Sequence, residues 1–124
     1  GENSIIKGDY SLSKAEERTR ELLSSGQKFD GLFAGNDLIA IGAINILLQN
    51  KIEVPDQVKV IGFDDSMLAA GNMPSLSTVN QPMREFGAEI ARSLIKILDG
   101  KKVERKLLDV KLVIRESTAK MKRN

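Results

Sequence analysis

The chain has 124 residues, with 19 lysines and arginines against 17 aspartates and glutamates, so its formal net charge is only +2. A charge this small supplies no general electrostatic attraction for nucleic acid. The sequence contains neither cysteine nor histidine, which excludes disulfides, thiolate catalysis, cysteine metal sites, and the commonest general base and zinc ligand. The absence of cysteine permits an intracellular origin. No apolar run is long enough for a membrane span, and the N-terminus does not resemble a signal peptide.

The first predicted elements are a strand and a helix. Residues 4–7 form a short strand candidate, and a helix then begins at Ser13, where Glu16 completes a capping box. The helix carries a narrow apolar stripe and ends at Gly26, a natural C-terminal stop.

A second strand is predicted at residues 31–34, which are apolar throughout. Either Asn36 or Asp37 then caps a helix that runs to about Asn50. A third strand, also mostly apolar, follows at residues 58–63.

The last third of the chain repeats this alternation. A fourth strand is predicted at residues 77–81, and Pro82 is suited to the first position of a helix that continues to Asp99, before Gly100. Residues 110–115 alternate in polarity and predict a last, edge-like strand. The basic residues around 101–106 and 120–123 are expected to form a solvated loop and tail, with a DNA or partner contact as the alternative.

Strands that alternate with helices, and that are apolar throughout, predict an α/β fold in which helices cover both faces of a parallel sheet. Ligands of such sheets bind at the carboxyl ends of the strands. Tyr10, Asn36 and Asp64 each follow a predicted strand, so we expect them to share one rim and to bind a small polar ligand through a ring, an amide and a carboxylate.

Each of these positions also has a purely structural interpretation. Asn36 and Asp37 can cap the following helix, and capping is the preferred role for Asp37. Asp65 is expected to cap a short segment from Ser66 to Ala70. Tyr10 can be an ordinary half-buried residue. Asp64 is the strongest ligand candidate, because a carboxylate at the end of a buried strand needs a polar partner or solvent.

The helix from Asp37 to Asn50 is apolar on nearly every side, so it is expected to be buried on more than one side. One side packs on its own sheet. The other side is predicted to meet a second subunit, and burial under other elements of the same chain is the alternative. The predicted interface residues are Leu38, Ile41, Asn45 and Leu48.

The final long helix has one broad apolar stripe, which is typical of a core-facing helix rather than a cofactor site. The stripe comprises Met83, Phe86, Gly87, Ile90, Ala91, Leu94, Ile97 and Leu98.

Several enzyme-like classes fit the sequence poorly. A receiver domain needs an acidic pair after its first strand, where this chain has Gly8-Asp9. A haloacid-dehalogenase phosphatase needs two aspartates separated by one residue after its first strand, whereas Asp64 and Asp65 are adjacent and late. Neither a G-x-G-x-x-G after a strand nor a P-loop is present. We therefore expect no catalysis, no metal and no cofactor.

Five segments, spread in order over nearly the whole chain, resemble the LacI/GalR family of bacterial transcription regulators. They are Gly8-Asp9-Tyr10-Ser11; residues 29–37 (FDGLFAGND) with 39–43; residues 54–65 (VPDQVKVIGFDD); residues 74–79 (PSLSTV) with Gln81-Pro82; and Ile114-Arg115-Glu116-Ser117-Thr118.

The resemblance implies a Rossmann-like, periplasmic-binding-protein-like fold, of which residues 1–124 would be a single partial domain from the C-terminal portion of the effector-binding region. It places Tyr10, Asn36 and Asp64 in the effector pocket and residues 37–50 at a homodimer or higher homo-oligomer interface. The helix at 82–100 would pack in the other subdomain. The implied protein is cytoplasmic, binds a sugar or related metabolite, and binds DNA only through a headpiece that is absent here.

A sugar-binding protein of a transport system shares this fold and is the rival hypothesis. The closing motif at residues 114–118 and the intensely apolar helix at 37–50 favour the regulator, because periplasmic binders are usually monomeric. A small enzyme is the third and least favoured alternative.

Overall fold

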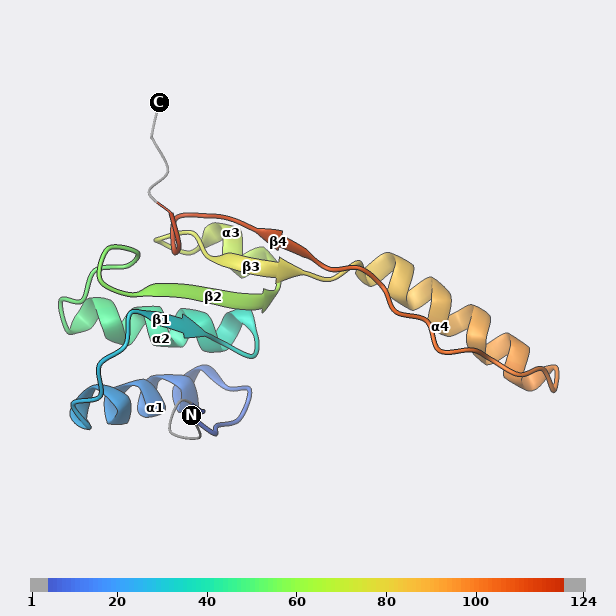
Figure 1. The fold of residues 1–124 in the computed structure, drawn as a ribbon, viewed down its shortest axis with the longest axis horizontal. Coiled ribbons are helices and arrows are strands. Elements are labelled where there is room, and N and C mark those ends of the chain that lie inside the picture. The colour runs from blue at the N-terminus through green and yellow to red at the C-terminus, as the bar shows by residue number, and fades with distance from the viewer. Residues whose placement is uncertain (1–4, 120–124) are drawn as a thin grey trace, which may run out of the picture.

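The computed structural model describes residues 5–119, which form a four-stranded sheet, three helices beside it and a fourth helix that projects away (Figure 1). The helices are α1 (Leu12–Ser24), α2 (Asp37–Gln49), α3 (Met67–Gly71) and α4 (Met83–Leu98), and the strands are β1 (Gly31–Phe33), β2 (Lys59–Asp64), β3 (Ser77–Asn80) and β4 (Lys111–Val113). Among the described residues, no helix is long and apolar enough to cross a bilayer.

The sheet has the order β1-β2-β3-β4. Strands β1, β2 and β3 are parallel, and β4 is antiparallel to β3 at the far edge. The predicted α/β fold with a parallel sheet is therefore confirmed, with the edge-like last strand where the alternating pattern placed it.

The first predicted strand does not form. Residues 5–7 lack strand structure and are exposed, and residue 4 lies outside the described part of the chain. Among the described residues, β1 pairs only with β2. Residues 5–7 therefore have no neighbouring strand, and an extended segment without a ladder partner is not stabilised as a strand.

The core lies between α2 and the sheet. Ile44 and Leu47 of α2 meet Val60 of β2 and Leu76 just before β3, and all four are fully buried. Ala69 of α3 belongs to the same cluster. Burying a side chain of this size contributes about 1.5–3 kcal/mol relative to leaving it exposed, so this cluster is the main source of stability in the sheet region.

Helix α1 packs on the outer side of α2 rather than on the opposite face of the sheet. The two helices approach closely at Gly42, where an added Cβ would lie 2.9 Å from the Cβ of Ala15 and 3.0 Å from the carbonyl oxygen of Leu12. Helix α1 thus covers the side of α2 that carries Gly42. Ile61 and Phe63, which point to the other face of β2, stay half-buried.

Helix boundaries are set by capping. Ser11, not Ser13, is the N-cap of α1: its hydroxyl accepts a hydrogen bond from the backbone N–H of Lys14 at 3.2 Å. The capping-box prediction was therefore wrong by two residues, because Ser13 already lies inside the helix. Gly26 and Gly100 follow the ends of α1 and α4 with φ of +71°, the left-handed conformation in which glycine commonly ends a helix.

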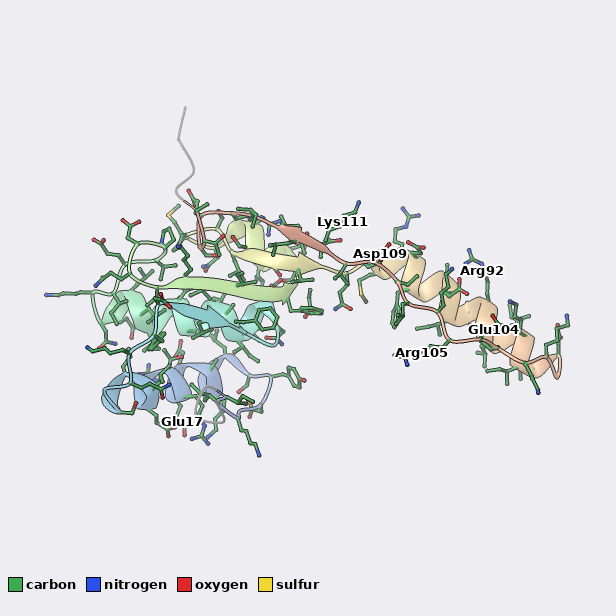
Figure 2. The ribbon with its side chains drawn as sticks, viewed as in Figure 1. Glu17, Arg92, Glu104, Arg105, Asp109 and Lys111 are labelled. Carbon is green, nitrogen blue, oxygen red and sulfur yellow. The ribbon has the colours of Figure 1, made fainter. Side chains whose placement is uncertain are left out.

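We call α4 together with residues 99–110 the arm. Figure 1 shows it extending from the side of the sheet at which the parallel strands end, with the returning segment beside the helix. Helix α4 has no buried residue: Phe86, Ile90 and Leu94 on its apolar stripe are 49%, 53% and 53% exposed. Arg92, Glu104 and Arg105 lie exposed along the arm (Figure 2).

Candidate functional site

The candidate site begins with Asp64, the last residue of β2. Its partner in the parallel register is Asn80, the last residue of β3. The next residue, Gln81, donates a hydrogen bond from Nε2 to Oδ1 of Asp64 over 2.7 Å. An exposed carboxylate and a half-buried amide therefore meet at the carboxyl edge of the sheet, where both can exchange hydrogen bonds with hydroxyl groups of a ligand.

Gln81 was not among the predicted site residues. The rule that identified Asp64 and Asn36, a polar residue directly after a strand, applies equally to Gln81 after β3. The prediction missed it because Gln81 was taken as the last residue of the strand itself, whereas β3 ends at Asn80.

The backbone at the end of β2 is unusual. Asp64 has a φ of +107° and Asp65 has a φ of +52°. Positive φ in residues other than glycine costs on the order of 1–3 kcal/mol each, persists only where the surroundings enforce it, and is concentrated at functional sites. The two consecutive values mark this turn as a constrained segment.

Asn36 lies directly after β1 and is the N-cap of α2. Its Oδ1 accepts a hydrogen bond from the backbone N–H of Ile39 over 2.8 Å. The capping alternative is thus confirmed for Asn36. Capping uses one lone pair of the side-chain oxygen, and the Nδ2 amide nitrogen is left to donate to a ligand.

Asp37 does not cap its own helix, contrary to the prediction. It is only 2% exposed, and its carboxylate accepts hydrogen bonds from the backbone N–H of Ser66 at 2.6 Å and from the hydroxyl of Thr78. The physical reason is the capping by Asn36, which leaves the Asp37 side chain to satisfy polar groups of the neighbouring turn and strand. Gly62 makes room for it, because a Cβ there would lie 2.4 Å from Oδ1 of Asp37.

Asp65 does not cap α3, and this prediction was also wrong. Its carboxylate forms an ion pair with Nη2 of Arg115 at 2.7 Å and accepts a hydrogen bond from Nδ2 of Asn80 at 2.8 Å. Ser66 is the N-cap of α3, and its side chain makes no capping bond. Burial raises the pKa of Asp65, but the hydrogen bonds from Arg115 and Asn80 and the charge of Arg115 outweigh it, so the pKa lies below its ordinary value.

Tyr10 occupies a different setting. It is 72% exposed and lines an open cavity of about 790 Å³ between residues 6–10, α1 and the stretch 27–35. The lining does not include Asn36 or Asp64. The argument that Tyr10 follows a strand fails because that strand does not form, and within residues 5–119 no hydrogen bond joins Tyr10 to the other two residues.

The predicted interface residues form one stripe on α2. Leu38, Ile41 and Asn45 are half-buried, and Leu48 is 42% exposed. They lie three or four positions apart, which places them on one face of the helix. Although α1 covers part of α2, this stripe remains partly accessible.

The part of the chain that the structure describes shows no arrangement of side chains that could coordinate a metal ion. Residues 5–119 contain no group of three or more acidic side chains that could hold a metal ion.

Comparison with known proteins identifies the family. The sequence model of one protein family, the periplasmic binding protein-like domain, matches residues 3–118. The ribose operon repressor of Halalkalibacterium halodurans is 36% identical over 118 residues, which are 94% of this chain and 36% of that protein. The chain thus spans about a third of the length of this relative.

Solved structures of transcriptional regulators resemble this chain as well. The transcriptional regulator CelR in complex with cellobiose superimposes with a TM-score of 0.82 at 36% identity, over 89% of this chain and 34% of that one. The lac repressor dimer bound to operator and an anti-inducer superimposes with a TM-score of 0.84 at 28% identity, over 94% and 43%. The chain belongs to the family of periplasmic-binding-protein-like domains, in the form found in LacI-family transcriptional regulators.

Proposed function

We propose that this chain is the effector-sensing and dimerising region of a DNA-binding transcriptional regulator, and that its ligand is a sugar or a related polar metabolite. The observation that carries the proposal is the Asp64–Gln81 pair on a constrained turn at the carboxyl edge of the sheet. Relatives named as a ribose operon repressor and as a regulator in complex with cellobiose support a sugar as the ligand class.

The other parts of the proposal follow from this role. DNA would be bound by a headpiece outside this chain, and the regulator would act in the cytoplasm and catalyse no reaction. Helix α4 would pack in a second subdomain, which agrees with the absence of buried residues along it. Asn36 would contribute to the ligand site from the edge beside Asp64, and Tyr10 from the adjoining cavity.

Calorimetric titration of the protein with D-ribose and cellobiose tests the ligand site. Asp64→Ala should weaken binding of whichever sugar binds by roughly tenfold or more, because a hydrogen bond to a charged group contributes about 1.5–3 kcal/mol. Asp99→Ala, which removes a carboxylate from the exposed end of α4, is the control and should bind like the unaltered protein. Unchanged affinity in Asp64→Ala would remove Asp64 from the site.

Dimerisation is tested by sedimentation. The lac repressor whose structure resembles this chain is a dimer bound to operator, and we propose that this chain pairs through Leu38, Ile41, Asn45 and Leu48. Ile41→Asp places a charge on that stripe and should shift the protein towards monomer or aggregate, whereas Lys102→Glu on the exposed arm should not. A clean monomer of the unaltered protein at micromolar concentration would contradict the proposal.

A further inference from the structure

The turn that carries Asp64 is enclosed by contacts from distant parts of the chain. Its two positive φ values, at Asp64 and Asp65, cost free energy that a flexible turn would release by relaxing. The local sequence does not relieve this cost, since neither residue is glycine. Contacts made by the turn must therefore maintain the conformation.

The first of these contacts comes from the end of the chain. Arg115 follows β4, and its guanidinium donates from Nη2 to Asp65 at 2.7 Å and from Nη1 to the carbonyl oxygen of Leu76 at 2.8 Å. The ion pair is largely buried, with the side chains of Arg115 and Asp65 only 20% and 16% exposed. One planar group thus joins the turn to the start of β3 through two bonds of fixed relative direction.

The second set of contacts comes from β3. Asn80 donates from Nδ2 to the Asp65 carboxylate at 2.8 Å, and the Thr78 hydroxyl accepts from the backbone N–H of Asp65 at 3.3 Å. Asn80 directly precedes Gln81, whose amide contacts Asp64. The side chains of Asp64 and Asp65 therefore hold adjacent residues of the same strand end.

We propose that Asp65 is a positioning residue for the candidate site: its bonds to Arg115 and Asn80 maintain the strained turn and thereby present the Asp64 carboxylate to Gln81. The functional consequence rests on the proposed effector site, because the turn matters for binding only if Asp64 contacts ligand. The geometric part does not depend on any ligand.

The Gln81 side-chain amide reports on this geometry directly. In a ¹⁵N-labelled chain, its two N–H resonances are assigned from their disappearance in Gln81→Glu, and their positions without the acceptor are given by Asp64→Ala. In Asp65→Asn, which removes the charge and keeps the shape, we expect these resonances to move more than half of the way to their Asp64→Ala positions. Asp99→Asn removes a carboxylate far from the turn and should leave them unchanged.

Two results would overturn the geometric part of the proposal. One is a folded Asp65→Asn chain whose Gln81 amide resonances coincide with those of the unaltered protein, which would mean that Asp65 serves stability alone. If Asp65→Asn does not fold, Arg115→Lys decides: a lysine keeps the charge but cannot bond Asp65 and Leu76 together with the same fork, so the Gln81 resonances should move in the same direction by a smaller amount. Resonances that stay in place in Arg115→Lys are the second contradictory result.

A titration with D-ribose and cellobiose separates this proposal from the proposed function. If Asp65→Asn moves the Gln81 resonances and also weakens sugar binding at least fivefold, both are supported. If the resonances move while neither sugar binds even the unaltered chain, the positioning role stands and the sugar class is wrong. Full sugar affinity in Asp65→Asn, with moved resonances, would show that the turn does not control the site and would overturn the functional half of the proposal.

Discussion

The sheet region and the arm each carry a helix rich in apolar residues, but the two helices lie in opposite situations. Leu47 of α2 is fully buried in the core cluster between α2 and the sheet, whereas Leu94 of α4 is 53% exposed. Both belong to apolar helix surfaces that the sequence shows clearly, nearly all round α2 and as one stripe on α4. The difference teaches that an apolar stripe indicates which face of a helix needs covering, while the identity of the covering element depends on the rest of the fold.

The largest expected effect tests this difference with one substitution made in both regions. Leu47→Ala should lower the free energy of unfolding by about 2–5 kcal/mol, because it leaves a cavity in a close-packed core. Leu94→Ala removes the same atoms from a half-exposed position and should cost less than about 1 kcal/mol. Urea denaturation followed by circular dichroism measures both. Equal losses would show that the arm is packed in solution against another surface.

A second comparison uses the two glycines Gly62 and Gly87. An added Cβ at Gly62 would lie 2.4 Å from Oδ1 of Asp37 and 2.9 Å from Cδ2 of Leu76, whereas at Gly87 it would meet nothing within 4 Å. Gly62→Ala should therefore destabilise by about 1–3 kcal/mol through overpacking. Gly87→Ala should stabilise by up to about 1 kcal/mol through helix propensity. Thermal melting of both variants shows whether each substitution raises or lowers the melting temperature. A melting temperature lowered by Gly87→Ala would contradict the open space around that position.

The third prediction concerns pH. The pKa of Asp65 is lowered in the folded chain, so its contribution to stability is present above the ordinary carboxyl pKa, near 3.9, and is lost as the pH falls through the lower folded value. Asp65→Asn should destabilise by about 1–3 kcal/mol at pH 7. This difference should shrink below about pH 4. Chemical denaturation at pH 7 and pH 3 measures it, and a difference that is independent of pH would exclude the charge as the cause.

The smallest effect is expected at the ion pairs of the arm. Glu89 lies 2.9 Å from Arg92 and 3.0 Å from Lys106, and these hydrogen bonds and charges lower its pKa. The carboxylate is solvated, so water and salt screen the attraction. Glu89→Gln should leave the denaturation midpoint unchanged within error, and a clear loss would indicate that residues 99–110 are held to α4 more firmly than exposed ion pairs allow.

Much of the fold could be predicted from the sequence because its signals are local. The runs at 31–34, 58–63 and 77–81 and the helices between them lie within one or two residues of the observed elements. The strand at 4–7 failed because a strand depends on a neighbour, and neighbours are not visible in local composition. The packing of α1 on one side of α2 was not predicted for the same reason, and the subunit contact through the remaining side stays a prediction.

The candidate site was predictable only in outline. Strand ends identified Asp64 and Asn36, because parallel strands bring their carboxyl ends to one edge. The actual partners of the acidic residues span long separations: Asp65 pairs with Arg115, and Asp37 with Thr78. Capping rules consider only the next few residues, so they assigned Asp37 and Asp65 to neighbouring helices and missed these long-range contacts.

Because β4 pairs antiparallel with β3, the arm is an insertion between two neighbouring strands of the sheet. Asn80 and Lys111 are direct partners in the ladder, so the chain leaves the sheet and comes back to it at adjacent points. For the sheet, the thirty residues between them amount to the loop of a β-hairpin, a connection that about two to five residues can close. Lengthening such a loop costs little additional entropy. The length and sequence of the arm can therefore change during evolution without altering the register of any strand.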